Sequence, residues 1–438
     1  MAPPLKVAVI GAGVAGLTAA RALKEEGLQV SVYEKSDRLG GTWVYDPRVE
    51  SDPLGLDPDR EVVHGSLYPS LRTNIPRQLM GFSDYPFGSR KNGDSRTFPG
   101  HEEVLDFLNE FAEEFGLVEL IRFNSEVVRV ERVGSRNDEW VVESRNGHSG
   151  SEEVFDAVVV CNGHHTQPRL AHFPGIEKWP GEQIHSHNYR QPDPFRNKVV
   201  VVIGAGPSAI DISADISKVA KEVHLSSRKP NTEISKVDYG DNIWQHSKVD
   251  CVDEHGVVSF EDGARLHADI ILYCTGYNYQ FPFLKTEGIV TVDDNRVGPL
   301  YKHVFPPKLA PNLSFIGLTY RCVWKQAAVS LVIDLQAKWV AKVISGKSVL
   351  PSQGEMLADV ERHYQDMEEK GIPKHYTHSL GQEVSYEYMD WLANQAGTPE
   401  VDEETKLKCK SYFNFVAENR LWKAKEWDPT VGLQPGNC

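Results

Sequence analysis

The 438-residue chain has few cysteines, and their spacing matches no disulfide or metal-binding pattern. The six are Cys161, Cys251, Cys274, Cys322, Cys409 and Cys438. The absence of a C-x-x-C pair and of a cysteine–histidine cluster argues against a dithiol redox centre and a zinc site. Scattered thiols in so long a chain indicate reduced cysteines and therefore an intracellular protein. Cys161 and Cys274 follow apolar runs, so we expect them to be small core residues.

The sequence also lacks a long apolar segment and an excess of positive charge. Its longest apolar stretch, 327–344, contains Asp334, Lys338 and Lys342, which predicts an amphipathic helix and not a membrane span. The N-terminus has no signal-peptide pattern. With 47 basic and 62 acidic residues the net charge is −15, which argues against nucleic acid or an anionic membrane as the main partner. We therefore expect a cytoplasmic protein without a membrane anchor.

What the chain does contain is the same strand–glycine–helix–strand pattern twice. The first unit comprises a strand over Leu5–Ile10, a helix over Val14–Glu26 and a strand over Gln29–Tyr33; the second comprises Lys198–Ile203, Pro207–Val219 and Glu222–Ser226. Two β-α-β units of this kind favour parallel sheets with right-handed crossovers. The fold class that we expect is α/β, with two Rossmann-like dinucleotide-binding domains.

The first unit carries the fingerprint Gly11-x-Gly13-x-x-Gly16. The first glycine permits a tight turn, the second lets the backbone approach a pyrophosphate, and the third lets helix and strand pack closely. The next strand is followed by Glu34, 23 positions after Gly11, and a carboxylate there accepts the hydroxyls of an unphosphorylated ribose. A second glycine-rich turn, Gly40–Trp43, suits close contact with a bulky cofactor. This unit predicts a site for FAD or NAD.

The second unit carries Gly204-x-Gly206-x-x-Ala209, and the position that corresponds to Glu34 is Ser227, followed by Arg228. A carboxylate would repel a ribose 2′-phosphate, whereas an arginine binds it with a planar, charge-assisted fork. The second unit therefore predicts an NADP(H) site. The alternative for Arg228 is a solvated cation at the end of a strand.

Two nucleotide sites still allow several chemistries. Disulfide reductases share this plan but need a redox cysteine pair, and the chain has no recognisable Ser/His/Asp set. Four histidines, His164, His165, His185 and His187, fit no metal-site spacing, so no metal is expected and we assign them to hydrogen bonds in linkers and loops. If a reduced flavin activates O2, the protein needs only shape, hydrogen bonds and a dry site.

The two units are separated in a way that predicts an insertion. Two similar apolar runs that begin with an acid, Asp156–Gly163 and Asp269–Gly276, bracket the second unit. The simplest architecture has residues 1–166 as the first part of an FAD-binding domain and 167–276 as an inserted NADPH-binding domain. Residues 277–438 then form the second part of the FAD-binding domain with a C-terminal helical region.

Several motifs resemble one family. The run Trp179-Pro-Gly181-x-x-x-His185-x-x-x-Tyr189 resembles F-x-G-x-x-x-H-x-x-x-[FY], the identifying motif of flavin-containing monooxygenases, with Trp179 in place of Phe. Baeyer–Villiger monooxygenases have Trp where this chain has Tyr189. The segment 71–76 (LRTNIP) is similar to the family segment whose Asn lies over the flavin, and 274–277 (CTGY) is similar to its A-T-G-Y strand end. The runs 161–164, 185–190 and 291–301 look most like the plant S-oxygenating, glucosinolate S-oxygenase-like group.

The resemblance implies a class B flavin monooxygenase that uses FAD, NADPH and O2. It implies that an FAD C4a-hydroperoxide oxygenates a small thioether to a sulfoxide, and that Asn74 helps to hold the hydroperoxide and NADP+. The expected FAD contacts are Gly11, Gly13, Gly16, Glu34, Lys35, Gly41, Thr42, Trp43 and Asn74; the expected NADPH contacts are Tyr189, Gly204, Gly206, Ser208, Ala209, Ser227 and Arg228. The alternatives are N-oxygenation of an amine or amino acid, an uncoupled NADPH oxidase or flavin reductase, and a nucleotide-binding sensor without activity. A homodimer is left open.

One segment departs from that plant group. After Gly317-Leu318 the group continues through a Pro-rich apolar stretch, whereas this chain has the segment Thr319–Gln326 (TYRCVWKQ). We expect this region to line the flavin edge or the substrate entrance, with Tyr320 and Trp324 as pocket aromatics. Trp43 is a third such aromatic, although core packing explains it equally well. The departure is the feature that could favour the oxidase alternative.

Overall fold

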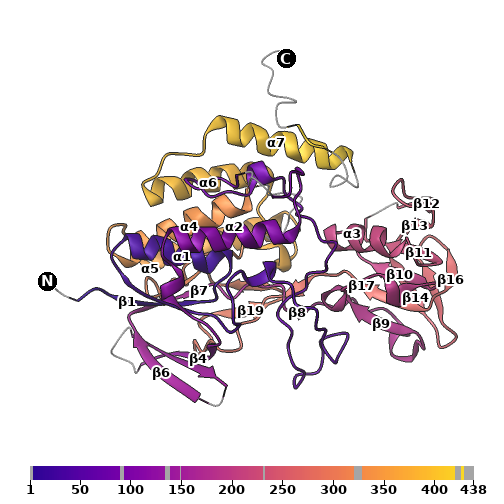
Figure 1. The fold of residues 1–438 in the computed structure, drawn as a ribbon, viewed down its shortest axis with the longest axis horizontal. Helices are drawn as coiled ribbons and strands as arrows, with labels where there is room; N and C mark the ends of the chain where they lie inside the picture. The colour runs from indigo at the N-terminus through magenta and orange to yellow at the C-terminus, as the bar shows by residue number, and fades with distance from the viewer. Residues whose placement is uncertain are drawn as a thin grey trace, which may run out of the picture.

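Two parallel sheets, set side by side, organise the chain (Figure 1). The computed structural model describes residues 3–88, 93–133, 139–147, 149–229, 232–319, 328–419 and 426–428. The helices are α1 (Val14–Glu25), α2 (His101–Glu114), α3 (Pro207–Ile216), α4 (Val329–Ile344), α5 (Gln353–Glu369), α6 (Gln382–Ala396) and α7 (Glu403–Glu418). The α/β fold class with two Rossmann-like domains is confirmed.

The first sheet has the order β21-β7-β1-β2-β3, and all of its strands are parallel. Its strands are β1 (Lys6–Ile10), β2 (Gln29–Tyr33), β3 (Ile121–Arg122), β7 (Ala157–Val160) and β21 (Leu313–Phe315). From β1 the chain proceeds to β2 on one side and later returns to β7 on the other. This reversal of strand order creates a crevice beyond the carboxyl ends of β1 and β7, where open α/β sheets bind ligands.

The second sheet repeats this design with the order β12-β13-β11-β10-β17-β9. Its strands are β9 (Glu182–His185), β10 (Val199–Ile203), β11 (Glu222–Ser226), β12 (Ser235–Lys236), β13 (Ile243–His246) and β17 (Ile270–Tyr273), and only β12 is antiparallel. Its switch point lies between β10 and β17. All of its strands come from residues 182–273, which lie between β7 and β21 of the first sheet, so the second domain is inserted into the first.

A small antiparallel sheet covers one face of each large sheet; the other face is covered by several helices in the first domain and by α3 in the second. The small sheets are β4 (Glu126–Arg132), β5 (Trp140–Asn146) and β6 (Ser149–Phe155) in the first domain, and β14 (Val249–Val252), β15 (Val257–Phe260) and β16 (Arg265–His267) in the second. Two further pairs are β8 (Gln167–Pro168) with β18 (Tyr277–Asn278) and β19 (Thr291–Asp293) with β20 (Arg296–Gly298). The β8–β18 pair joins the chain that leaves the first domain to the chain that returns.

The apolar runs Asp156–Gly163 and Asp269–Gly276 have the same structural role in the two domains. The Asp156 carboxylate accepts the backbone N–H of Lys6 at 2.6 Å, and the Asp269 carboxylate accepts that of Val199 at 2.8 Å, so each acid fixes the start of a central strand. At the other end of these strands, a Cβ on Gly11 would lie 2.6 Å from the Cys161 carbonyl oxygen. A Cβ on Gly204 would lie 2.5 Å from that of Cys274. Because Gly11 and Gly204 also have φ of +103° and +132°, only glycine suits either position.

Helix α4 forms where the sequence predicts an amphipathic helix, and much of its surface is covered by other helices. Most of its residues are buried, including Asp334 and Gln336, because α1 packs on one side and α6 on the other. The Asp334 carboxylate accepts the Ser83 hydroxyl at 2.6 Å and pairs with Lys338 at 3.1 Å, which explains how an acid is accommodated there. Helices α6 and α7 lie outside this layer, near the top of Figure 1. None of the helices in the described residues combines the length and apolar composition needed to cross a bilayer.

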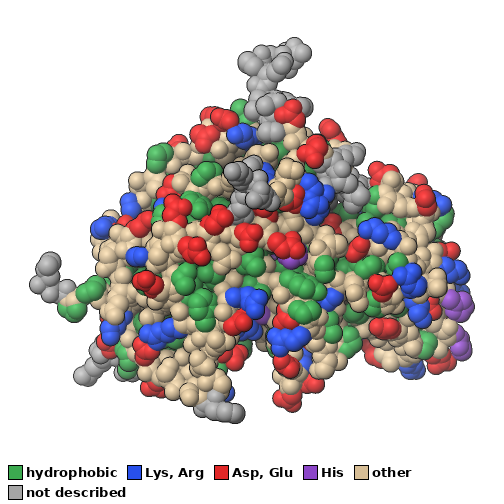
Figure 2. All heavy atoms as spheres, in the orientation of Figure 1, with side chains coloured by type: hydrophobic (Ala, Val, Ile, Leu, Met, Phe, Trp, Pro, Cys, Tyr) green, Lys and Arg blue, Asp and Glu red, His purple; other side chains and the backbone are tan. Residues whose placement is uncertain are grey.

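The outer face shown in Figure 2 carries acidic and basic side chains in an interspersed pattern, with acidic groups prominent along the lower and upper edges. The described part of that face presents no broad basic area of the kind that binds a nucleic-acid backbone.

Candidate functional site

One cavity of about 620 Å³ runs along the carboxyl ends of both parallel sheets. It reaches the glycine turns after β1 and β10, and it includes the residues that follow β7 and β17. The position agrees with the two switch points, since each lies beside a central strand. The glycine turns of both fingerprints therefore line the same cavity.

The first half of the cavity is built around the turn from β1 into α1. Gly11 and Gly13 line it, and the N-terminus of α1 faces it with unpaired N–H groups that suit a phosphate. A Cβ on Gly41 would lie 3.0 Å from the Gly13 Cα, so side chains on these two glycines would close the gap between the turns. Because Gly13 and Gly41 have no side chains, the two turns leave room for a pyrophosphate beside the backbone.

Glu34 lies at the end of β2 and lines the same half of the cavity. Its Oε2 accepts the backbone N–H of Ala12 at 2.9 Å, and its Oε1 accepts the N–H and O–H of Ser36 at 2.9 and 2.8 Å. These bonds hold the carboxylate in one orientation. An ionised carboxylate has about four acceptor positions, so it retains capacity for a ribose hydroxyl.

The second half of the cavity is built around α3. Gly206, Pro207 and Ser208 form its first turn and line the cavity, and a Cβ on Gly206 would meet no atom within 4 Å. Arg228 follows β11, lines the cavity and has an exposed side chain. A helix N-terminus and a nearby guanidinium suit the pyrophosphate and the 2′-phosphate of one ligand.

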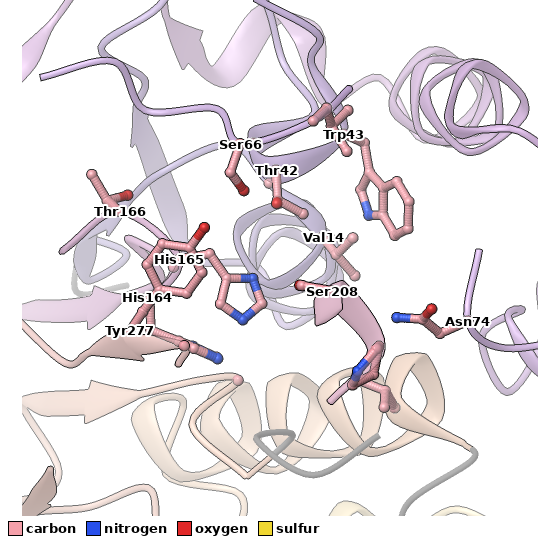
Figure 3. A pocket seen from close by; sticks show the side chains of 18 of the residues that line it. Val14, Thr42, Trp43, Ser66, Asn74, His164, His165, Thr166, Ser208 and Tyr277 are labelled. Atoms are coloured by element: carbon pink, nitrogen blue, oxygen red, sulfur yellow. The ribbon is translucent and has the colours of Figure 1, made fainter. Parts of the chain in front are cut away.

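Asn74 projects toward the middle of the cavity from the lining segment Leu71–Ile75, with the Trp43 ring nearby (Figure 3). Two distant elements hold its backbone. The Tyr412 hydroxyl of α7 donates to the Asn74 carbonyl, and the neighbouring Thr73 N–H donates to the Pro99 carbonyl at 2.9 Å. The Asn74 amide is thus presented by a fixed backbone.

Ten of the predicted cofactor residues line the cavity and six do not. Those that line it are Gly11, Gly13, Glu34, Gly41, Thr42, Trp43, Asn74, Gly206, Ser208 and Arg228. The six others are Gly16, Lys35, Tyr189, Gly204, Ala209 and Ser227. Gly16 and Ala209 lie where each helix packs on its sheet, and a Cβ on Gly16 would lie 1.8 Å from the Gly11 carbonyl oxygen. Lys35 is exposed just after β2 and is not part of the cavity lining.

Tyr189 is placed differently from the prediction of an NADPH contact. Its ring is 1 % exposed and packs on Tyr68 and Phe195, with centroid distances of 5.2 and 5.8 Å. Its hydroxyl donates to the Asp215 carboxylate of α3 at 2.7 Å. Tyr189 therefore supports α3 from beneath, and its ring is not part of the cavity lining.

The sequence did not identify one wall of the cavity. His375, Tyr376 and Ser379, in and after a short 3-10 turn (Lys374–Tyr376) between α5 and α6, line it together with Arg169. The Asp294 carboxylate holds this wall, since it lies 2.9 Å from His375 Nδ1 and 3.5 Å from the Arg169 guanidinium. No local motif marks these residues, because the wall is assembled from segments more than 80 positions apart.

Four of the ionisable groups that line the cavity are kept neutral near pH 7 by burial. Burial lowers the pKa of His64 to about 3 and raises the pKa of Tyr277 to about 12. Burial also raises the pKa of the Cys161 thiol, and that of Cys274 to about 12. Both cysteines are buried and free, so these thiols neither form a disulfide nor carry charge. These four groups therefore supply neither a thiolate nucleophile nor an imidazolium acid.

The four histidines of the linker have different surroundings. His164 and His165 line the cavity, contrary to a purely linker role, and the His165 ring lies 5.2 Å from Tyr277. His185 and His187 are fully buried; the His185 ring lies 3.1 Å from the Gly276 carbonyl oxygen, and the His187 ring 2.8 Å from that of Val63. Across the described residues no group of three His, Cys, Asp or Glu side chains is arranged to hold a metal.

Most of the atypical segment Thr319–Gln326 lies outside the described residues. Tyr320 and Trp324, the predicted pocket aromatics, are among them. Thr319 is buried, and the preceding Gly317 and Leu318 line the cavity. Trp43 lines the cavity and also packs against the core.

Two Rossmann-like domains that open onto one cavity define an oxidoreductase of the two-dinucleotide type. The chain belongs to the flavin-binding monooxygenase-like family, whose model matches residues 4–245 and 235–404. It is 53% identical to the flavin-containing monooxygenase FMO GS-OX-like 2 of Arabidopsis thaliana over 424 residues, which cover 95% of this chain and 89% of the relative. It is 50% identical over 431 residues to FMO GS-OX5 of the same plant, covering 97% and 92%. The expected resemblance to the plant S-oxygenating group is confirmed.

Solved structures support the same family. The S-allyl-L-cysteine S-oxygenase of Allium sativum is 48% identical, covers 98% of this chain and 97% of its own, and superposes with a TM-score of 0.93. Tmm of Pelagibacter sp. strain HTCC7211 is 28% identical with a TM-score of 0.79, covering 98% and 95%. OTEMO in complex with FAD and NADP, at 17% identity and a TM-score of 0.59 over 91% and 98%, shares the fold.

Proposed function

We propose that this flavin monooxygenase oxidises the sulfur of a small thioether to a sulfoxide, using NADPH and O2. The observation that carries the proposal is the similarity to an S-allyl-L-cysteine S-oxygenase along almost the whole of both chains. The relatives named FMO GS-OX support the same reaction class. The cofactors are FAD and NADPH, and reduced FAD supplies the activated oxygen when it is bound.

We assign the first half of the cavity to FAD and the second half to NADPH. Gly11, Gly13 and Gly41 would admit the FAD pyrophosphate, and Glu34 would accept a ribose hydroxyl. The N-terminus of α3 would bind the NADPH pyrophosphate, and Arg228 its 2′-phosphate. Residues 1–166 and 277–438 would form the FAD-binding domain and residues 167–276 the NADPH-binding domain. The change of sheet between β7 and β9, and again between β17 and β21, supports these boundaries.

Asn74 would act at the junction of the two halves. Its amide projects between the FAD turn and α3, and it can donate a hydrogen bond without being an acid (Figure 3). A donor that cannot release a proton would stabilise negative charge on oxygen without protonating it. The backbone contacts from Tyr412 and Pro99 keep this donor in place.

The protonation state of the two substrate types favours sulfur over nitrogen as the site of oxidation. A thioether is nucleophilic in its only protonation state. An alkyl amine with a pKa of about 10 is protonated at pH 7 and must lose a proton before it can attack. The buried His64, Tyr277 and Cys274 of the cavity lining are neutral near pH 7 and are weak bases for that proton.

A direct comparison of pH profiles tests this choice. We expect a dialkyl sulfide to give a sulfoxide with a kcat/KM that changes little between pH 7 and 9. A tertiary amine that carries the same two alkyl groups and an additional methyl group should show a kcat/KM that rises about tenfold per pH unit, because only its neutral fraction reacts. Chromatography of the products with both substrates present measures the preference. An N-oxide as the main product at pH 7 would contradict the proposal.

A further inference from the structure

Arg190 follows the family-identifying motif, and its side chain is buried outside the cavity. A guanidinium has five N–H donors, and every one of them is engaged here by a backbone carbonyl. Nε donates to Asp46 at 2.8 Å, Nη1 to His187 at 2.8 Å and Tyr189 at 2.9 Å, and Nη2 to Arg48 at 2.8 Å and Gly65 at 2.9 Å. Such charge-assisted bonds are among the strongest in proteins.

Two of these acceptors, Asp46 and Gly65, are the ends of one loop, residues 46–65. The ends are close together, because a Cβ on Gly65 would lie 3.9 Å from the Asp46 Cβ. The loop is an Ω-type excursion, seen below β8 in Figure 1, and Arg190 closes its base. Trp43, just before the loop, and Ser66, just after it, both line the cavity.

The middle of the loop is bonded to the linker that leads from β9 to β10 in the second sheet. The buried Glu50 carboxylate lies 3.2 Å from His187 Nε2 and accepts Arg60 Nε at 2.6 Å. The Glu50 N–H donates to the Asn188 side-chain oxygen at 2.9 Å, and Asn188 Nδ2 donates back to the Asp52 carbonyl at 3.2 Å. The loop belongs to the part of the chain that we assign to FAD, but Glu50 and Asp52 also bond to His187 and Asn188 of the other domain.

The tip of the loop makes an apolar contact with the second domain. Leu54 packs against the hydrophobic cluster on the second sheet, which includes Phe173, Trp179 and Val252. By contrast Leu56, two positions later, is 63 % exposed. The base, middle and tip of the loop are therefore all attached to the second domain or its linker.

We propose that Arg190 is a positioning residue for hydride transfer. The hydrogen bonds of Arg190 close the base of loop 46–65. The closed loop then holds the NADPH-binding sheet in one orientation relative to the FAD turn. The inference rests on the proposed assignment of the two cavity halves, and it does not depend on the identity of the oxygenated substrate. Hydride transfer requires reacting atoms at van der Waals contact, and a displacement of about 1 Å can cost about 100-fold in rate.

The test compares Arg190→Met with Arg48→Met in the FAD-loaded enzyme. Arg48 lies in the same loop, but its side chain is 65 % exposed and pairs only with Asp46 and Glu61. Arg190→Met should speed amide hydrogen exchange over residues 46–65 by about tenfold or more, as measured by mass spectrometry. It should slow flavin reduction at saturating NADPH by about tenfold or more while FAD content stays unchanged. Arg48→Met should change neither quantity.

A second pair of variants covers the case in which Arg190→Met does not fold. Leu54→Ala removes the contact at the tip, and Leu56→Ala removes an exposed side chain of the same size. Only Leu54→Ala should accelerate amide hydrogen exchange over residues 46–65 and slow the reduction of the flavin by NADPH. Normal flavin reduction in both folded Arg190→Met and Leu54→Ala would overturn the inference. If the unaltered enzyme were not reduced by NADPH, the proposed function itself would fail instead.

Discussion

Replacing Arg228 with alanine is expected to raise the Kd for NADPH by about tenfold to a hundredfold, because a charge-assisted pair with the 2′-phosphate is lost. NADH lacks that phosphate, so its Kd should change little. Titration of flavin or nicotinamide fluorescence with both nucleotides measures the two constants. The informative quantity is the ratio of the NADPH Kd to the NADH Kd, because a general disturbance of the domain would change both constants alike.

The control for this change is Arg265→Ala. Arg265 lies on β16 of the same domain, its side chain is 68 % exposed, and its nearest acid is Asp253 at 4.0 Å. Arg265→Ala should leave the Kd for NADPH and the Kd for NADH unchanged. Equal weakening of NADPH and NADH by Arg228→Ala would show that Arg228 does not bind the 2′-phosphate.

Replacing Asn74 with alanine or aspartate is expected to lower the rate of substrate oxygenation by about 100-fold or more, which is typical for loss of a placed hydrogen-bond donor. NADPH should still be consumed, because the fingerprints at Gly11 and Gly206 are untouched. The electrons should then appear as hydrogen peroxide. Aspartate should uncouple at least as strongly as alanine, since it cannot donate when ionised and can protonate oxygen when it is not.

The measurement for Asn74 is the peroxide released per NADPH oxidised, in the presence of a thioether. The control is Asn109→Ala on α2, where the amide donates to the Leu105 carbonyl at 2.9 Å and lies away from the cavity lining. Its peroxide yield should match that of the unaltered enzyme. Full coupling in Asn74→Ala would remove Asn74 from the proposed chemistry.

The parts of the fold that could be predicted are those set by short-range patterns. The strand bounds Gln29–Tyr33 and Glu222–Ser226 agree with the structure residue for residue. Glycine turns, apolar periodicity and an acid before each buried run are local signals, and each reflects a nearby steric or hydrogen-bonding need. The insertion of one domain into the other followed from the repeated order of these signals.

The parts that could not be predicted depend on contacts between distant segments. The His375–Asp294 wall joins residues 81 positions apart, and the Arg190 bond to Asp46 spans 144. Tyr189 shows the same limit, since its family motif predicts a site residue but its ring packs under α3. Helix α4 is buried because α6, a later element, covers it. A cytoplasmic location and a homodimer stay predictions.

The most direct test of the central claim is rapid mixing of the NADPH-reduced enzyme with oxygenated buffer, followed by flavin absorbance. The account predicts that the oxidised flavin spectrum returns slowly without substrate, and that a thioether accelerates its return as sulfoxide forms. Immediate return of the oxidised spectrum with release of hydrogen peroxide, unaffected by any thioether, would contradict it and identify an NADPH oxidase.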